Sequence, residues 1–364
     1  MEEQKKAFAK LARPNWFKRH KRLAIILSIV AVLPIGGGVA AALYFLNQKP
    51  AEVVQEQVIE PEEEPEPVKY YSPLTGNLVE TEAATTQAVT GVMIENSPDA
   101  RPQSGIKNSG VVFEAIAEGG ITRFLVLYQQ EKPQTVGPVR SVRLYYVDWL
   151  AAFNASVAHI GGSYEALQEV RNGSYRDIDQ FFNSKYYRRA SDRAAPHNVY
   201  TSFKDLDALN ASKGYTTSSF TGFTRTDSEA LPTPTAKSID VKISSATFNS
   251  HYDYNTTTNT YDRSQGGAPH TDREDGRVSP RVVIVMKVPQ QRVLEDGWRE
   301  QITTIGSGQA YIFQDGDVKQ VTWKKTGKTA QITFTDTDGK DVPLARGQTW
   351  ITAVPATTGS VTWL

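Results

Sequence analysis

The residues best suited to chemistry lie between positions 95 and 198, where carboxylates, arginines and histidines stand beside glycine and proline. Two of them, Glu114 and Glu118, could form an acid/base pair, because glycosidases place two carboxylates around a glycosidic bond. On one strand, residues four apart are separated by about 13 Å, at roughly 3.3 Å per residue. Glycosidases need about 5–9.5 Å, so this pair is disfavoured unless Glu118 lies beyond the strand end. A salt bridge from Glu118 to Arg123 or Arg140 is the simpler interpretation.

A second candidate is a site for an anion. Its side chains are Arg123, Arg140, Arg143 and Asn198. The run Gly161, Gly162 and Ser163 separates a predicted strand from a predicted helix, so its backbone N–H groups can point at a negative ligand. Arginine adds bidentate hydrogen bonds to carboxylate or phosphate. In the alternative interpretation, the glycines form a tight turn and the arginines pair with Glu95, Glu114 and Glu118.

Two histidines complete the set of candidates. His197 follows a proline in a loop and could act as a general base. His159 ends an apolar strand, where a structural hydrogen bond is the simpler role. The chain has no HExxH motif or comparable ligand spacing, so we predict no metal site and no cofactor. A GxSxG motif is also absent, which leaves a serine-hydrolase mechanism without support.

Strands that alternate with helices are expected to position these residues. Helices are predicted over 143–154, 164–171 and 202–212. Short apolar runs rich in β-branched and aromatic residues predict strands over 88–95, 110–117, 122–129 and 156–160. This alternation indicates a mixed α/β domain over residues 71–228. Since α/β folds commonly place ligands at strand ends, the polar strand ends are candidate binding positions.

The second half of the chain is predicted to be almost wholly β. Residues 229–238 carry two prolines and are interpreted as a connection between an α/β half and a β half. Residues 239–364 then form a mainly antiparallel β domain, with Asp315-Gly316 as a two-residue hairpin turn. Its strands are predicted over 239–248, 281–288, 309–313, 318–323, 331–335 and 349–354. The predicted fold class is α+β, preceded by one transmembrane helix.

The first 70 residues are predicted to attach the protein to a membrane. Residues 1–22 form a basic tail, and Leu23–Leu46 runs without a charge for long enough to cross a hydrocarbon core of about 30 Å. The basic flank places the N-terminus in the cytoplasm and the following domains outside. Residues 47–70 form an acidic Pro/Glu linker that favours an extended chain. A cleaved signal peptide is the alternative, although its apolar region is usually only about 7–15 residues long.

Composition narrows the class of protein further. The chain of 364 residues has a formal net charge of +0, so no overall positive field favours nucleic acid. It contains no cysteine, so its stability must come from burial rather than disulfides. Because there is also no cysteine to carry a lipid anchor, the predicted helix is the visible membrane attachment.

Several runs of residues carry a family resemblance, among them GVMIENSPDARPQSG, VVFEAIAEGGITRFLVLYQ, VGPVRSVR, HIGGS, RAAPHNVYTS and IGSGQAYIFQDG. They lie between about Tyr71 and Pro355, and together they resemble the YerB lipoprotein family, whose members are largely of unknown function. The resemblance implies a two-domain envelope protein that faces outward, and it supplies no established reaction. This sequence differs from the family name in lacking a lipid-bearing cysteine.

These observations predict a membrane-anchored, extracytoplasmic protein of a bacterial cell envelope. We expect it to bind an anionic cell-wall polymer or an envelope protein partner. The alternative is a cell-wall glycan hydrolase or lyase that uses Glu118 and His197 as acid and base. Because no established catalytic signature is present, the sequence favours binding over catalysis.

Overall fold

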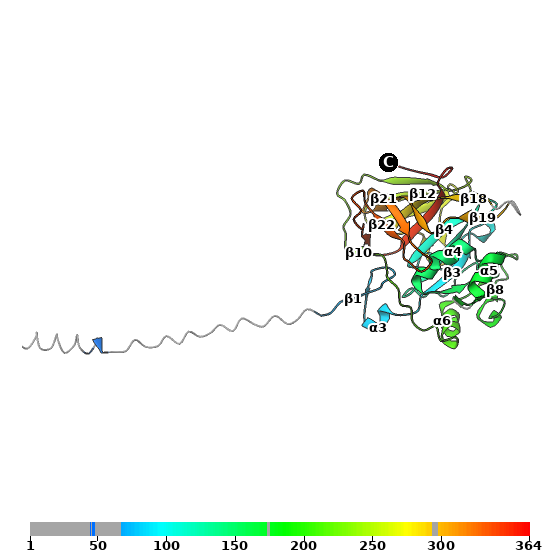
Figure 1. Cartoon of the computed structure of the whole chain (residues 1–364), viewed down its shortest axis with the longest axis horizontal. Coiled ribbons are helices and arrows are strands. Elements are labelled where there is room, and N and C mark those ends of the chain that lie inside the picture. Colours follow the sequence, from blue (N-terminus) through cyan, green and yellow to red (C-terminus); the bar gives the residue numbers. More distant parts are fainter. Residues whose placement is uncertain (1–43, 45, 48–66, 173–174, 293–297) are drawn as a thin grey trace, which may run out of the picture. The chain divides into compact units, whose positions relative to one another are not determined.

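A computed structural model describes residues 44, 46–47, 67–172, 175–292 and 298–364. The chain divides into two units, residues 1–66 and residues 67–364 (Figure 1). The basic tail, nearly all of the predicted transmembrane helix and most of the linker lie outside the described residues. Among the residues that are described, no helix has the length and apolar character needed to cross a membrane.

The first half of the folded unit alternates strands with helices, as the sequence predicts. Its helices are α3 (Glu82–Thr85), α4 (Leu144–Leu150), α5 (Tyr164–Arg171) and α6 (Phe203–Ser212), with 3₁₀ turns at Pro98–Ala100, Ala151–Phe153 and Ser184–Tyr186. Its strands are β1 (Tyr70–Tyr71), β2 (Leu78–Val79), β3 (Thr90–Glu95), β4 (Val111–Glu118), β5 (Ile121–Tyr128), β6 (Ser156–Ala158), β7 (Arg176–Asp177), β8 (Arg188–Arg189), β9 (Val199–Tyr200) and β10 (Arg225–Thr226). Helix α6 starts where Ser202 accepts a hydrogen bond from the backbone N–H of Asp205, which satisfies a donor that the helix itself leaves free.

The described part of the second half contains strands and no helix. They are β11 (Ser238–Lys242), β12 (Ser250–Asn255), β13 (Thr260–Gln265), β14 (Ala268–Pro269), β15 (Thr271–Asp272), β16 (Gly276–Arg277), β17 (Val282–Val288), β18 (Gln290–Arg292), β19 (Glu300–Ile302), β20 (Gly306–Gln314), β21 (Asp317–Lys325), β22 (Thr333–Thr335), β23 (Leu344–Ala345), β24 (Thr349–Pro355) and β25 (Ser360–Trp363). The predicted hairpin is confirmed, because Gln314 pairs with Asp317 across the turn. Asp315 and Gly316 both have positive φ, at 59° and 79°, which a tight hairpin of this kind requires.

One ten-stranded sheet runs through both halves of the folded unit, in the order β22-β21-β20-β17-β24-β4-β5-β3-β6-β7. Its central junction is the parallel pair of β24, from the second half, with β4, from the first. Every residue of β24 is buried, as expected for a strand covered on both faces. A second, five-stranded antiparallel sheet has the order β14-β13-β12-β11-β25.

The hydrophobic core is also shared by the two halves. One buried cluster joins Phe113 and Trp149 to Ile284 and Trp323, and a second joins Phe124 to Trp350. We expected residues 229–238 to separate an α/β half from a β half. The two sequence halves on either side of this segment share cores, because β24 returns to pair with β4.

Candidate functional site

Several of the polar residues singled out in the sequence lie at one edge of the ten-stranded sheet, where strands end. Strands β3 and β4 are both antiparallel to β5, and β3 is parallel to β6, so these three strands end at the same edge. Glu95 is the last residue of β3, Glu118 is the last of β4, and His159 follows β6. The expectation that strand ends position these groups is therefore met, in the arrangement that α/β sheets use for ligands.

The most unusual group at this edge is the carboxylate of Glu95, whose side chain is only 4% exposed. Its Oε1 atom accepts a hydrogen bond from Ser97 Oγ at 2.9 Å and lies 3.0 Å from His197 Nδ1. Arg140 Nε lies 3.3 Å from the same oxygen. Its Oε2 atom is buried and has no hydrogen-bond partner in the described part of the chain. A buried carboxylate is stable only beside such cations and donors, so Glu95 fixes the positions of Arg140 and His197.

Backbone hydrogen bonds hold the arginine in place. The N–H of Arg140 donates to the carbonyl of Met93 at 2.8 Å, and the N–H of Glu95 donates to Pro138 at 2.9 Å. The Arg140 side chain is 23% exposed, and the described residues offer its terminal nitrogens no hydrogen-bond acceptor. These nitrogens are consequently available to a ligand from outside.

The Nε2 atom of His197 is also without a close partner among the described residues. It lies 3.9 Å from Asp99 Oδ2, beyond hydrogen-bonding distance, and the Asp99 side chain is 81% exposed. Asn198, predicted as a ligand-binding residue, holds the loop together. Its Oδ1 atom accepts from Arg189 Nη1 at 2.9 Å, and its Nδ2 atom donates to the carbonyl of Ala190 at 3.2 Å.

A second ion cluster surrounds Glu118, which pairs with Arg123 at 2.7 Å and with Arg143. Arg123 Nη1 also donates to the carbonyl of Ser141 at 2.8 Å, next to Arg140. Burial raises the pKa of Glu118, but the two arginines outweigh burial and hold it below its usual value of 4.5.

This pairing bears on the acid/base hypothesis for Glu118 and His197. The ionised form of Glu118 is favoured, whereas a general acid must carry a proton near neutral pH. In the described residues no contact joins Glu118 to His197, whose carboxylate partner is Glu95. The geometry therefore offers no specific support for a glycosidase pair.

The glycine run forms a tight turn. Gly161 has a φ of 65°, and a Cβ atom on Gly162 would lie 2.7 Å from the Val142 side chain. The N–H of Ser163 donates to the carbonyl of Val142 at 3.2 Å, and the N–H of Gly161 faces Asp179 at 3.5 Å. Two of the donors that we expected to face an anion are thus used inside the protein.

His159 lies beside this turn and is fully buried. Its Nδ1 atom lies 2.8 Å from the carbonyl of Gly161, and its Nε2 atom lies 3.0 Å from Asp177 Oδ1. Both ring nitrogens therefore have partners within the fold. This geometry agrees with the structural hydrogen-bonding role expected from the sequence.

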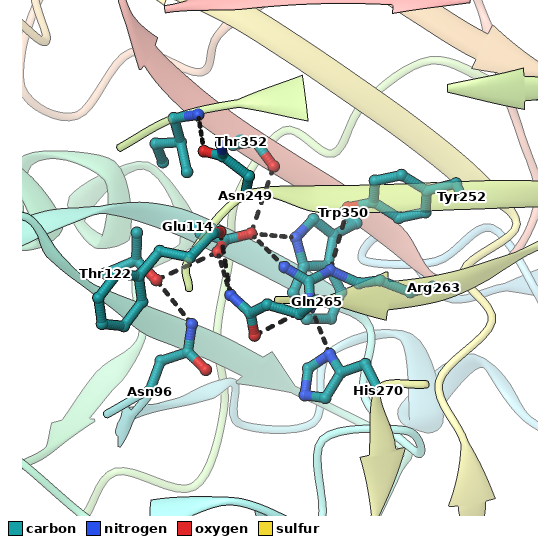
Figure 2. A network of polar contacts seen from close by, with 12 residues as sticks. Asn96, Glu114, Thr122, Asn249, Tyr252, Arg263, Gln265, His270, Trp350 and Thr352 are labelled. Carbon is teal, nitrogen blue, oxygen red and sulfur yellow. Dashed lines mark hydrogen bonds and ion pairs between the residues drawn. The ribbon is translucent and has the colours of Figure 1, made fainter. Parts of the chain in front are cut away.

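Glu114 takes part in a buried network that links the two halves of the chain (Figure 2). Its Oε2 atom lies 2.9 Å from Arg263 Nη2, and both side chains are 0% exposed. Trp350 Nε1 donates to the same oxygen at 3.0 Å. The network extends to His270, whose pKa is held well below 6.5 by burial and by Arg263. It has no opening to solvent at Glu114, so its evident role is structural.

Other features of the surface do not add to this site. Among the described residues no cluster of three or more histidine or acidic side chains could hold a metal ion. Two hollows of about 400 and 210 Å³ are lined by other residues, including Lys132, Glu274 and Arg273.

Comparison with known proteins identifies the family. Residues 74–216 match the N-terminal domain, and residues 239–351 the C-terminal domain, of the family described as "Protein of unknown function (DUF3048)". A protein of Bacillus subtilis (strain 168), named "Putative lipoprotein YerB", is 33% identical over 297 residues, which cover 79% of this chain and 87% of that protein. The chain belongs to the YerB family.

The YerB assignment extends to the fold. The crystal structure of the YerB protein from Bacillus subtilis matches with a TM-score of 0.71 and 31% identity, covering 81% of this chain and 100% of the crystallised chain. The two-domain α+β fold, rich in strands and with few helices, is therefore that of YerB. The resemblance expected from the sequence motifs is confirmed.

In this YerB-family chain, sequence reasoning missed the central part that Glu95 plays. It considered Glu95 only as a partner for arginines, and it assigned no role to Ser97 or Asp99. The available signal was the run Glu95-Asn96-Ser97-Pro98, which places polar groups directly after an apolar strand. Arg140, a predicted ligand residue, and His197, a predicted acid/base residue, meet at Glu95, while the predicted ligand residues Arg123 and Arg143 meet at Glu118.

Proposed function

We propose that this YerB-family protein is a membrane-attached, extracytoplasmic module that binds an anionic polymer of the cell wall. The binding site is the edge of the sheet where Arg140 and His197 border Glu95. The observation that carries this proposal is the guanidinium group of Arg140, whose terminal nitrogens have no acceptor within the described residues.

The geometry around Arg140 supports a ligand with carboxylate or phosphate groups. The Nε atom of the guanidinium lies 3.3 Å from Glu95 Oε1. The two terminal nitrogens together present a planar pair of donors, which suits bidentate contact with an oxyanion. Because the Arg140 side chain is 23% exposed, a large ligand can reach these donors without entering a cavity.

His197 supplies a second polar contact in this proposal. Its Nδ1 atom is directed toward Glu95 at 3.0 Å, so its Nε2 atom is turned away from that carboxylate. A group held in one orientation by a buried partner loses little entropy when it binds, which favours affinity. A polymer that carries repeated anionic groups can contact both side chains.

Membrane attachment is supported by the name of the Bacillus subtilis relative, which describes it as a lipoprotein. This chain has no cysteine to carry a lipid, so we assign attachment to the predicted helix Leu23–Leu46. Protease added to intact spheroplasts should then remove the folded unit while leaving a membrane-bound N-terminal fragment. Protection of the folded unit, or a mature N-terminus near Ala42, would exclude this topology.

The binding proposal is tested with the fragment 67–364, which contains the three hydrophobic clusters and the region that matches the crystallised relative. Arg140→Ala should weaken binding to purified cell wall by roughly tenfold to a hundredfold, since a charge-assisted hydrogen bond contributes about 1.5–3 kcal/mol. Arg346→Ala is the matched control, because Arg346 is also 23% exposed and also pairs with one carboxylate. Arg346 contacts Gly76 and Tyr71, near the start of the folded unit.

Thermal stability measured on the same preparations separates binding from folding. Loss of wall binding by Arg140→Ala, with a melting temperature close to that of Arg346→Ala, supports the proposal. A lowered melting temperature with unchanged wall binding assigns Arg140 a structural role and refutes it. Binding that survives chemical removal of the anionic polymer from the wall would instead indicate an envelope protein or another wall component as the partner.

A further inference from the structure

A group of exposed aromatic rings lies at the same edge of the sheet as Arg140. In the described part of residues 67–364, the aromatic side chains exposed by more than 60% are Tyr164 (72%), Phe181 (63%), Phe182 (71%) and Trp298 (67%). We call these four residues the aromatic surface. Buried rings dominate the rest of the folded unit, so this gathering of exposed rings requires an explanation.

The four rings come from three segments of the chain, whose contacts place them at this end of the sheet. Phe181 follows β7, and its ring lies 3.3 Å from the position of a Cβ atom on Gly161. The ring of Trp298 lies 3.1 Å from the corresponding position on Gly119, directly after β4. Arg299 Nη1 bonds Glu165 Oε2 at 3.0 Å and so joins the Trp298 segment to the first turn of α5, where Tyr164 lies. In Figure 1, α5 and β19 lie on the same side of the folded unit.

The aromatic surface adjoins the proposed anion contact. The N–H of Ile160 donates to the carbonyl of Arg140 at 3.1 Å, and Ser141 Oγ donates to the carbonyl of Ile160 at 3.0 Å. Gly161 and the Phe181 ring follow immediately. A ligand that reaches from Arg140 along this edge must therefore cross exposed rings.

Charge at the aromatic surface is balanced in pairs. Arg143 is paired with Glu118, Arg299 with Glu165, and Arg171 with Asp179. The guanidinium of Arg171 also lies 5.1 Å from the ring centre of Phe182. Arg143 shares Glu118 with Arg123, so each of these cations contacts a carboxylate, and the pairs provide both donors and acceptors. That combination fits the hydroxyl groups of a sugar better than an anionic lipid surface, which requires unpaired cations.

The chain enters the folded unit at a distance from the aromatic surface. Residues 74 and 75 lie at the opposite end of the sheet, where Leu74 packs within 2.4 Å of the Cβ position of Gly110, just before β4. The aromatic surface lies beyond the other end of β4, which has eight residues and is about 26 Å long. The segment that leads from the linker therefore meets the folded unit far from the aromatic surface.

From these observations we infer that the aromatic surface binds the sugar rings of a cell-wall glycan. This inference rests on the proposed function and specifies its ligand as a glycan that carries anionic groups. The sugar rings stack on the aromatic side chains, while Arg140 contacts the carboxylate or phosphate substituents. Stacking uses the apolar faces of the sugars, and the flanking ion pairs exchange hydrogen bonds with their hydroxyl groups.

The test uses an uncharged N-acetylglucosamine oligomer as the probe, titrated into the fragment 67–364 by calorimetry. Tyr164→Leu keeps apolar area but removes the ring, and it should weaken binding about three- to tenfold, as expected for one aromatic contact. Tyr164→Phe keeps the ring and should bind as the wild type does. Leu78→Ala is a control at the other end of the sheet, because Leu78 is 64% exposed.

Two results would overturn the inference. One is that the wild-type fragment does not bind the oligomer; the other is that Tyr164→Leu binds it as tightly as Tyr164→Phe. The second result would mean that any apolar side chain suffices, as in a contact with protein. Arg140→Ala separates the two proposals, because it should weaken wall binding without changing affinity for the uncharged oligomer. Wall binding unaffected by Arg140→Ala but weakened by Tyr164→Leu would refute the anion contact and retain the glycan contact.

Discussion

Replacing Arg263 with methionine should destabilise the whole folded unit, because Arg263 is the ionic partner of the buried Glu114. Both side chains are 0% exposed, and Arg263 Nη2 lies 2.9 Å from Glu114 Oε2 (Figure 2). Arg263 also packs over Trp350 at 4.5 Å from the ring centre. Methionine preserves part of this packing but removes the charge and its hydrogen bonds.

The expected loss is about 3–5 kcal/mol of unfolding free energy, the usual cost of leaving one partner of a buried pair uncompensated. After the substitution, Glu114 keeps neutral donors, with Trp350 Nε1 at 3.0 Å and Thr122 Oγ1 at 3.3 Å. These donors limit the loss but do not neutralise a buried charge. The double variant Arg263→Met, Glu114→Gln should therefore lose less unfolding free energy than the two single variants lose when their losses are added.

Urea unfolding followed by tryptophan fluorescence and by circular dichroism measures this effect. Both probes should report one transition, because the sheet and the cores are shared by the two halves. Arg346→Ala, which breaks an ion pair with the 84% exposed Asp227 and the contacts of Arg346 with Gly76 and Tyr71, should cost less than Arg263→Met, because no buried charge is left unpaired. A loss below about 1 kcal/mol for Arg263→Met, or two separate transitions in the wild type, would refute this reasoning.

Two further predictions concern acid stability and backbone conformation. Arg123 and Arg143 hold the pKa of Glu118 below 4.5 despite burial, so its ionised form stabilises the fold above pH 4.5, and that stabilisation disappears as the pH falls through the lowered pKa. Unfolding curves should show Glu118→Gln less stable than wild type at pH 7, with the difference shrinking as the pH falls below 4.5. A difference that stays constant on acidification would contradict this. Gly316→Ala should cost roughly 1–3 kcal/mol more unfolding free energy than Gly339→Ala. The two glycines have nearly the same φ, 79° and 78°, but a Cβ atom would lie 2.6 Å from the Tyr254 side chain at Gly316 and would meet nothing within 4 Å at Gly339. Equal melting temperatures for the two variants would show that the contact is relieved without cost.

Local elements of this fold were largely predictable from the sequence. The helix predicted over 164–171 matches α5, and the strand predicted over 281–288 contains β17 (Val282–Val288). The Asp315-Gly316 turn was predictable because the two positions need positive φ, which this pair of residues tolerates. Apolar periodicity and turn chemistry act within a few residues, so one sequence reveals them.

The candidate site was predictable in part for the same reason. Polar residues after apolar strands indicated an edge of the sheet, and Arg140 and His197 do meet at such an edge. Their common partner Glu95 was considered only as one of three glutamates. Which carboxylate pairs with which arginine depends on the order of β3, β4 and β5 and on the path of the loops between them.

The sequence by itself determined the local elements, the polar strand ends, the family resemblance and an uncharged run long enough to cross a membrane. Only the tertiary structure decided that β24 pairs with β4 and that Glu114 meets Arg263, 149 residues away. It also brought Tyr164 and Phe181 to the edge that holds Arg140. The physical reason is that such pairings depend on sheet register and on packing between distant segments, which the pattern of a single short stretch does not specify.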